Sequence, residues 1–226
     1  MEAQQTGTEQ LSVPFVHNTN EDRHICEIAA ILNRAGKHRL AHAPWQDRYP
    51  SRANVQFTVA YGSDYIYLQY NVEEPVVLAA YGKNNNPVYK DSCVEAFFSF
   101  DGGATYYNFE FNAIGTVLAA YGAAKESRDY LPDALLEQIQ SQSVIRKEGR
   151  GTMVNWQFTV AIPFTVFVHQ PFTSLDGQAC SANFYKCGDN LPEPHFLCWS
   201  PVQSKEPNFH LPQFFGKLLF VPGLEN

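Results

Sequence analysis

The stretch that decides the fold runs from Tyr89 to Asn112 and reads YKDSCVEAFFSF over residues 89–100 and YYNFEFN over residues 106–112. In both segments aromatic residues alternate with carboxylates and amides, which is the period-two pattern of a β-strand. The link Asp-Gly-Gly-Ala over residues 101–104 is rich in turn formers and predicts a hairpin. One set of side chains would enter a core, and the other set is expected to be exposed: Glu95, Asn108, Glu110 and Asn112.

Strand patterns dominate the rest of the chain as well. Alternating or apolar runs predict further strands over residues 54–60, 64–72, 115–121, 152–162, 180–187, 195–200 and 216–221. A helix is expected over residues 21–33, capped by Asn18, Thr19 or Asn20, and a short one near residues 132–141. Many short strands and few helices predict an all-β fold, an antiparallel β-sandwich of the immunoglobulin or jelly-roll type with one or two short helices.

The length of 226 residues allows one or two domains, and β-sandwiches of this size are often single domains. The polar residues 1–12 are expected to form a flexible tail. No linker or repeat interrupts the strand pattern, so residues 13–226 are expected to form one β-sandwich domain.

Charge argues against two classes of partner. The net charge is −7 and the 16 Lys and Arg residues are dispersed, so no nucleic-acid partner is expected. No apolar run reaches the length of about 18 residues that a membrane-spanning helix needs, so no membrane partner is expected either. The first residues, 1–5, have neither a basic start nor an apolar run, and no signal peptide is expected.

The cysteines are odd in number and have no framework spacing; they are Cys26, Cys93, Cys180, Cys187 and Cys198. This pattern favours reduced, buried thiols, and hence a cytoplasmic location. A Cys180–Cys187 disulfide is the alternative. A zinc site built from Cys180, Cys187, His195 and Cys198 has suitable residue types, but the spacing is not that of paired zinc knuckles.

The order of motifs along roughly residues 20–222 resembles the carbohydrate-binding modules of family nine and their single-domain relatives. The matching motifs are, in chain order, Trp45 after a short helix, a strand over 65–72, Tyr89-x-Asp91-Ser92-x-Val94-Glu95, Tyr107-x-Phe109-x-Phe111-Asn112-x-x-Gly115, a strand ending in Ile162-Pro163-Phe164, and Trp199, Pro207, Phe215-Gly216 and Leu218.

The resemblance implies non-catalytic binding of a mono- or oligosaccharide between two aromatic side chains. Tyr89 resembles one wall of this clamp, Trp199 the other, and Glu95 the carboxylate that accepts hydroxyl protons, with Asn112 as a further polar contact. Glu110 or Lys186 could add hydrogen bonds. The family usually has a tryptophan at the position of Tyr89, and it often has an arginine near the second strand. This sequence shows neither residue.

The chemistry of sugars favours such a surface independently of the resemblance. Sugar rings present C–H faces that stack on aromatic rings, while carboxylates and amides hold the hydroxyls through fixed hydrogen bonds.

Two other classes of function stay open. A glycan-active enzyme would use Glu95 and Glu110 as a carboxylate pair, but nothing in the sequence marks an acid and a base, so catalysis is the less favoured alternative. A structural or interaction sandwich that has lost the sugar site is the third. No cofactor is expected. Calcium is implied only by the resemblance, and the loop aspartates Asp101, Asp129, Asp133, Asp176 and Asp189 form no recognisable calcium loop.

Overall fold

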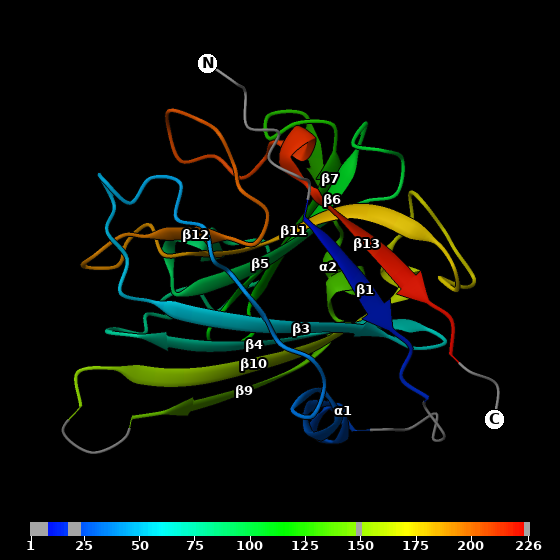
Figure 1. Cartoon of the computed structure of the whole chain (residues 1–226), viewed down its shortest axis with the longest axis horizontal. Coiled ribbons are helices and arrows are strands. Elements are labelled where there is room, and N and C mark those ends of the chain that lie inside the picture. The colour runs from blue at the N-terminus through cyan, green and yellow to red at the C-terminus, as the bar shows by residue number, and fades with distance from the viewer. Residues whose placement is uncertain (1–8, 18–23, 148–150, 224–226) are drawn as a thin grey trace.

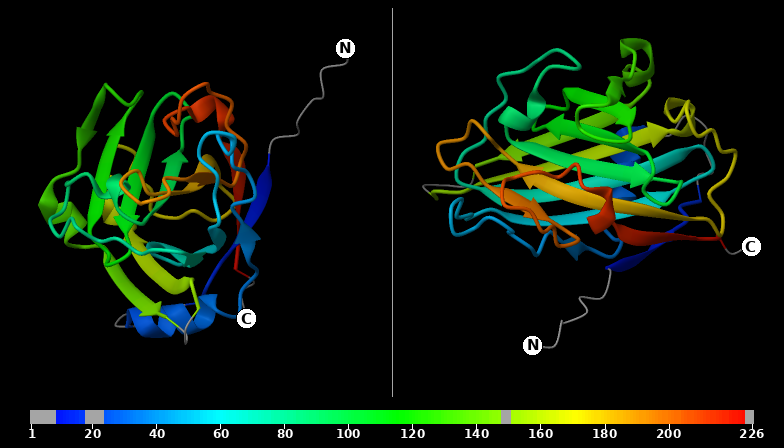
Figure 2. Two further views of the ribbon diagram at one scale, coloured as in Figure 1. Left: turned by 90° about the vertical axis from the view of Figure 1, so that its left-hand side faces the viewer. Right: turned by 90° about the horizontal axis from the view of Figure 1, so that it is seen from above.

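A computed structural model describes residues 9–17, 24–147 and 151–223, which fold into two stacked β-sheets (Figure 1; Figure 2). The strands are β1 (Gln10–Pro14), β2 (His38–Arg39), β3 (Asn54–Tyr61), β4 (Tyr65–Glu74), β5 (Cys93–Ser99), β6 (Tyr106–Asn112), β7 (Val117–Gly122), β8 (Arg128–Tyr130), β9 (Gln140–Arg146), β10 (Val154–Pro163), β11 (Ala179–Cys187), β12 (Phe196–Cys198) and β13 (Gly216–Val221). The α-helices are α1 (Ile25–Leu32) and α2 (Asp133–Leu136). Short 3-10 turns cover Val88–Lys90, Phe164–Val166 and Pro212–Phe214.

The predicted hairpin lies near the middle of the larger sheet. That eight-stranded sheet has the order β1-β13-β11-β5-β6-β7-β8, with β12 paired to β11, and the five-stranded sheet has the order β2-β3-β4-β10-β9. All strand pairs are antiparallel except β1 with β13, which are parallel. The predicted β-sandwich with few helices is therefore confirmed. No helix in the described part of the chain is long and apolar enough to cross a membrane.

Aromatic side chains fill the space between the sheets. Phe184 of the eight-stranded sheet and Phe57 of the five-stranded sheet lie with ring centroids 4.3 Å apart, and Phe111 and Phe158 make a similar pair at 5.1 Å. All four are fully buried. Burying a ring of this size stabilises the fold by roughly 1.5–3 kcal/mol, so this core supplies much of the driving force for stacking the sheets.

Helix α1 covers part of the outer face of the five-stranded sheet, below that sheet in Figure 1. Ile25, Ile28 and Leu32 recur at helical spacing and pack against Ala60 and Ala161. The side chain of His24 caps the first turn by accepting a hydrogen bond from the Cys26 amide at 3.4 Å. The predicted caps at residues 18–20 lie outside the described residues.

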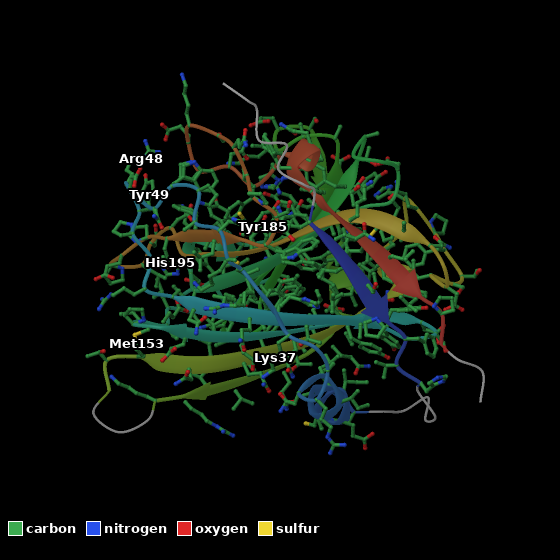
Figure 3. All side chains as sticks on the ribbon, viewed as in Figure 1. Lys37, Arg48, Tyr49, Met153, Tyr185 and His195 are labelled. Atoms are coloured by element: carbon green, nitrogen blue, oxygen red, sulfur yellow. The ribbon has the colours of Figure 1, made fainter. Side chains whose placement is uncertain are left out.

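A layer of loops covers the outer face of the eight-stranded sheet. Tyr185, labelled in Figure 3 within the upper sheet, stacks on Phe209 of the segment 199–215 with ring centroids 4.1 Å apart. Trp45 donates its indole N–H to the Ser204 carbonyl at 2.7 Å and fixes the same segment. We call this covering the loop layer: residues 42–51, 76–92 and 188–215. Because of it, the expectation that one face of the hairpin is exposed is wrong: Glu95, Asn108, Glu110 and Asn112 are all at most 3% exposed.

Three further expectations need correction. Residues 10–12 were expected in a flexible tail, but they belong to β1, which gains its backbone partners from β13. The helix expected near residues 132–141 ends at Leu136, and the chain then enters β9, an edge strand whose polar sequence gave no strand signal. The short strands β2 and β8 were likewise not predicted.

A buried ion pair links the two sheets at one end. Nζ of Lys186, on β11, lies 3.0 Å from Oε2 of Glu74, on β4, and both side chains are fully buried. His195, labelled in Figure 3, lies 3.1 Å from the same Nζ, and Trp156 donates its indole N–H to Oε1 of Glu74 at 2.7 Å. Lys186 therefore points between the sheets, and its expected contact with a sugar is wrong.

Replacing Lys186 with methionine tests this link. The change leaves the Glu74 carboxylate buried without its cation, so we expect the free energy of unfolding in urea to fall by about 3–5 kcal/mol. The exposed Lys217→Met serves as control and should change it by less than about 0.5 kcal/mol. The double variant Glu74→Gln/Lys186→Met should recover part of the loss. An unchanged stability of Lys186→Met would contradict the link.

Candidate functional site

A cavity of about 350 Å³ opens through the loop layer onto the outer face of the eight-stranded sheet. Its floor includes Glu95 from β5 and Glu110 from β6. Its sides come from three parts of the chain far apart in sequence: Tyr89 of the loop layer, residues 125–130, and Cys187 of β11 with the loop-layer residues 189–210. The cavity therefore depends on the sheet for its floor and on the loop layer for its walls.

The two floor carboxylates are direct cross-strand partners in the register of β5 and β6. Residues in such positions have Cβ atoms roughly 4.5–5.5 Å apart, so the two side chains share one environment. Oε1 of Glu95 accepts a hydrogen bond from the Cys187 thiol at 3.0 Å, and Oε1 of Glu110 accepts one from the Asn108 amide at 3.1 Å. Oε2 of Glu110 is buried and has no hydrogen-bond partner.

Burial disfavours the ionised form of both carboxyls. It raises the pKa of Glu110 to about 7, although the Arg128 guanidinium nearby favours the carboxylate. Burial, reinforced by the charge of Glu110, raises the pKa of Glu95 well above its ordinary value. Burial also raises the pKa of Asp189, a third acid in the cavity. The cavity thus concentrates acidic groups with few cations to balance them.

Arg128 and Lys125 are the basic side chains in the cavity lining, and no motif in the sequence predicted that Arg128 lies there. Arg128 begins the three-residue strand β8, and its Nη1 lies 3.5 Å from Oε1 of Glu110. The same nitrogen lies 3.3 Å from Nε2 of His210. Burial together with Arg128 lowers the pKa of His210 to about 2, so the ring is neutral and can accept a hydrogen bond. Arg128 lies beside Glu110 because β8 pairs with β7, which in turn pairs with β6.

Aromatic side chains lie at the mouth and walls of the cavity. Tyr89 lies within the 3-10 turn Val88–Lys90 before β5 and is partly exposed. Tyr130 at the end of β8 is 57% exposed, and Phe196 of β12 is partly buried. Of the predicted residues, the structure brings Tyr89, Glu95 and Glu110 together in this one cavity.

Trp199, expected to form the second wall, does not lie at this cavity. Its side chain is 5% exposed and packs in the core between the sheets, against Phe184 with ring centroids 5.6 Å apart and Phe57 at 6.2 Å. The expectation is wrong because Trp199 follows β12 directly, and its backbone amide bonds to Phe184 of β11, which sets the ring on the inner face.

Asn112, expected to contact the sugar, has a structural role instead. It is fully buried and outside the cavity lining. Its amide donates to the Tyr81 carbonyl at 2.7 Å and to the Asp91 carboxylate at 3.0 Å, and its carbonyl accepts from the Thr116 amide at 2.9 Å. Asp91 in turn accepts from the amide of Tyr81. Asn112 and Asp91 therefore position the segment that leads to Tyr89.

The cysteines are all unpaired, so the alternative of a Cys180–Cys187 disulfide is wrong. The zinc ligands suggested by sequence do not converge either. Cys180 belongs to the core between the sheets, Cys187 faces the loop layer, and His195 contacts Lys186 and Glu74.

One group of three possible metal ligands exists within residues 9–17, 24–147 and 151–223: Cys93, Glu95 and Cys187. Two thiols do not suit calcium, which prefers oxygen ligands. Asp101, among the loop aspartates, uses its carboxylate to hold the β5–β6 turn by accepting from the Thr105 amide at 3.0 Å. No group of three carboxylates comes together among the described residues, so calcium stays a prediction from the resemblance alone.

Two other hollows are larger but lack this combination of groups. The first, of about 600 Å³, lies between the end of β13 and residues 35–38 and has no carboxylate in its lining. The second, of about 430 Å³, lies on the outer face of the five-stranded sheet and is lined mainly by amides such as Asn71 and Gln157. The only aromatic residue in its lining is Trp156, which is 2% exposed and offers no platform.

The sequence matches the family described as carbohydrate-binding family 9 over residues 26–220. Comparison with curated proteins gives no match. The fold matches a crystal structure of a candidate carbohydrate-binding protein from Bacteroides uniformis, with a TM-score of 0.87 and 36% identity, covering 95% of this chain and 100% of that chain.

Two structures of a family 9 carbohydrate-binding module from Caldicellulosiruptor kristjanssonii share the fold at 11% identity. One is a complex with cellotriose, with a TM-score of 0.65, covering 96% of each chain. The other is a complex with glucose, with a TM-score of 0.61, covering 96% of this chain and 98% of that chain.

The raised pKa of Glu110 makes a prediction about stability. Its pKa is about 7 in the folded chain against an ordinary 4.5, so the native state retains a proton that the unfolded state loses between these values. The protonated Glu110 carboxyl therefore contributes to the free energy of unfolding below pH 4.5, and this contribution is lost as the pH rises through 7. Glu110→Gln removes the effect. From pH 5 to pH 8 the wild type should lose about 2–3 kcal/mol relative to this variant in urea unfolding.

The exposed Glu126→Gln, at the rim of the same cavity, is the matched control and should show no such difference. A stability difference between wild type and Glu110→Gln that does not vary with pH would show that Glu110 is not held in this environment.

Proposed function

The chain belongs to carbohydrate-binding family 9, and on that premise we propose that it binds a sugar in the cavity above Glu95 and Glu110. Binding is non-catalytic in this proposal. A sugar ring stacks on Tyr89 at the mouth, with Tyr130 in place of the expected Trp199 as the second aromatic surface. Glu95, Glu110 and Arg128 exchange hydrogen bonds with its hydroxyls.

The convergence of an accessible tyrosine with a buried, unsatisfied carboxylate carries the proposal. Oε2 of Glu110 is buried at the cavity floor and accepts no hydrogen bond from another described protein group. A sugar hydroxyl can donate to it. Arg128 and the protonated form of Glu95 can donate hydrogen bonds to hydroxyl oxygens. A sugar hydroxyl can therefore both donate and accept a hydrogen bond in this cavity.

The cavity volume suggests the size of the ligand. At about 350 Å³ it lies near the lower limit of small-molecule sites, which favours one or two sugar rings over a long chain. The neighbouring modules crystallised with glucose and cellotriose suggest glucose and short β-glucans as the first ligands to test.

Tyr89→Ala tests the stacking surface. We expect the dissociation constant for glucose or cellobiose, measured by calorimetry or by NMR titration, to rise by a factor that corresponds to about 1–3 kcal/mol. Tyr65→Ala, a partly buried tyrosine on the five-stranded sheet, is the control and should leave the affinity unchanged. Equal affinities for both variants would contradict a sugar stacked on Tyr89, and the absence of binding to any sugar at millimolar concentration would end the proposal.

A second candidate function rests on the carboxylate pair itself. Two adjacent carboxyls whose pKa values are both raised by burial resemble the acid and base of a glycosidase. In that case the protein would hydrolyse aryl glycosides, and Glu95→Gln would abolish turnover. For a binding protein, we expect no turnover above background by the wild type across an aryl-glycoside panel. Measurable wild-type turnover that Glu95→Gln removes would favour the enzyme.

A further inference from the structure

The outer face of the eight-stranded sheet holds a compact group of thiols and a carboxylate below the cavity. Cys93 on β5 and Cys187 on β11 are direct partners in the antiparallel register. Glu95 lies two residues after Cys93, so both point to the same side of β5. That side faces the loop layer, because Val94 and Ala96, on the other side of β5, pack in the core between the sheets.

The three side chains present their ligand atoms toward one another. The two sulfurs and one carboxylate oxygen all lie within 4.8 Å of each other, and Sγ of Cys187 is 3.0 Å from Oε1 of Glu95. In a tetrahedral zinc site, ligand atoms are roughly 3.5–3.8 Å apart, as follows from Zn–S and Zn–O bond lengths.

The surroundings of this group carry an excess of acidic side chains. Glu110 faces Glu95 across the strand pair, and Asp189 lies in the same cavity. Arg128 is 3.5 Å from Glu110, but Lys186, beside Cys187 in sequence, points to the opposite face and is held by Glu74. A divalent cation would balance these acids.

We propose that Cys93, Glu95 and Cys187 bind a zinc ion at the base of the cavity. The mixed set of two thiolates and one carboxylate suits zinc, since calcium prefers oxygen ligands alone and Cu(I) prefers softer ones. A water molecule from the cavity can complete the tetrahedron, as in zinc sites with three protein ligands, and this leaves Oε2 of Glu110 to a sugar hydroxyl. On binding, both thiols lose their protons to solvent and each sulfur forms a bond to the metal.

Ion entry is possible from the cavity, because Glu95 and Cys187 are part of its lining. The site does not rest on sugar binding: Cys93 lies outside that lining, and its substitution by serine leaves Tyr89, Glu110 and Arg128 in place. Failure of zinc binding would therefore leave the sugar proposal intact, and failure of sugar binding would leave the zinc site intact.

Titration with Co²⁺ under reducing conditions tests the proposal. The Cys26→Ser background removes the one exposed thiol. We expect one equivalent of Co²⁺ to produce the thiolate-to-cobalt charge-transfer absorption of a two-thiolate site, and one equivalent of Zn²⁺ to remove it. Zinc affinity is then measured by competition with a chromophoric chelator.

Variants assign the ligands. Cys93→Ser and Cys187→Ser should lose the charge-transfer band and weaken zinc binding by more than the roughly 10–100-fold expected for loss of a supporting group. Cys180→Ser and Cys198→Ser replace equally buried thiols outside the group and should keep the band. Glu95→Gln keeps both sulfurs and should retain the band with at least about tenfold weaker affinity. Circular dichroism confirms that each variant is folded.

Absence of the band in the folded Cys26→Ser protein would overturn the proposal. So would a band that persists in the Cys93→Ser/Cys187→Ser double variant, because the thiolates would then come from elsewhere.

Discussion

The loop layer covers the outer face of the eight-stranded sheet, and the rest of the structure depends on this covering. A sheet buried on both faces has no solvent to satisfy its polar side chains, so each must find a partner within the protein. Asn112 and Asp91 hydrogen-bond to each other and to the backbone around them, and Lys186 forms an ion pair with Glu74 on the inner face. Below the cavity, Oε2 of Glu110 has no hydrogen-bond partner among the described residues. The cavity above it is the place where the covering is incomplete.

Much of the sandwich could be predicted from the sequence, because strands such as β3, β5 and β10 alternate apolar with polar residues. The elements that were missed, among them β1, β8 and β9, are short or polar and owe their place to backbone pairing with neighbouring strands. The same limit applies to burial. Alternation shows that Glu95 and Glu110 share a face, but it does not show that loops from elsewhere cover that face.

In the candidate site, some residues could be placed from local alternation and others depend on strand pairing. Tyr89, Glu95 and Glu110 all come from the stretch 89–112 that the sequence singles out, and they line one cavity. Trp199 was assigned to the wrong face because its side depends on the pairing of β12 with β11. Arg128 and the partnership of Cys93 with Cys187 depend on strand order, which no local pattern in the sequence records. One acidic face can therefore serve both a sugar above it and a metal ion within it.

A crystal structure of the protein soaked with glucose and with cellobiose is the measurement that tests the central claim most directly. Our account predicts electron density for a sugar ring in the cavity, with its face against Tyr89 and a hydroxyl within hydrogen-bond distance of Oε2 of Glu110. Sugar bound only in the amide-lined hollow on the five-stranded sheet, beside Asn71 and Gln157, would contradict it. An empty cavity at a ligand concentration that saturates binding in solution would do the same.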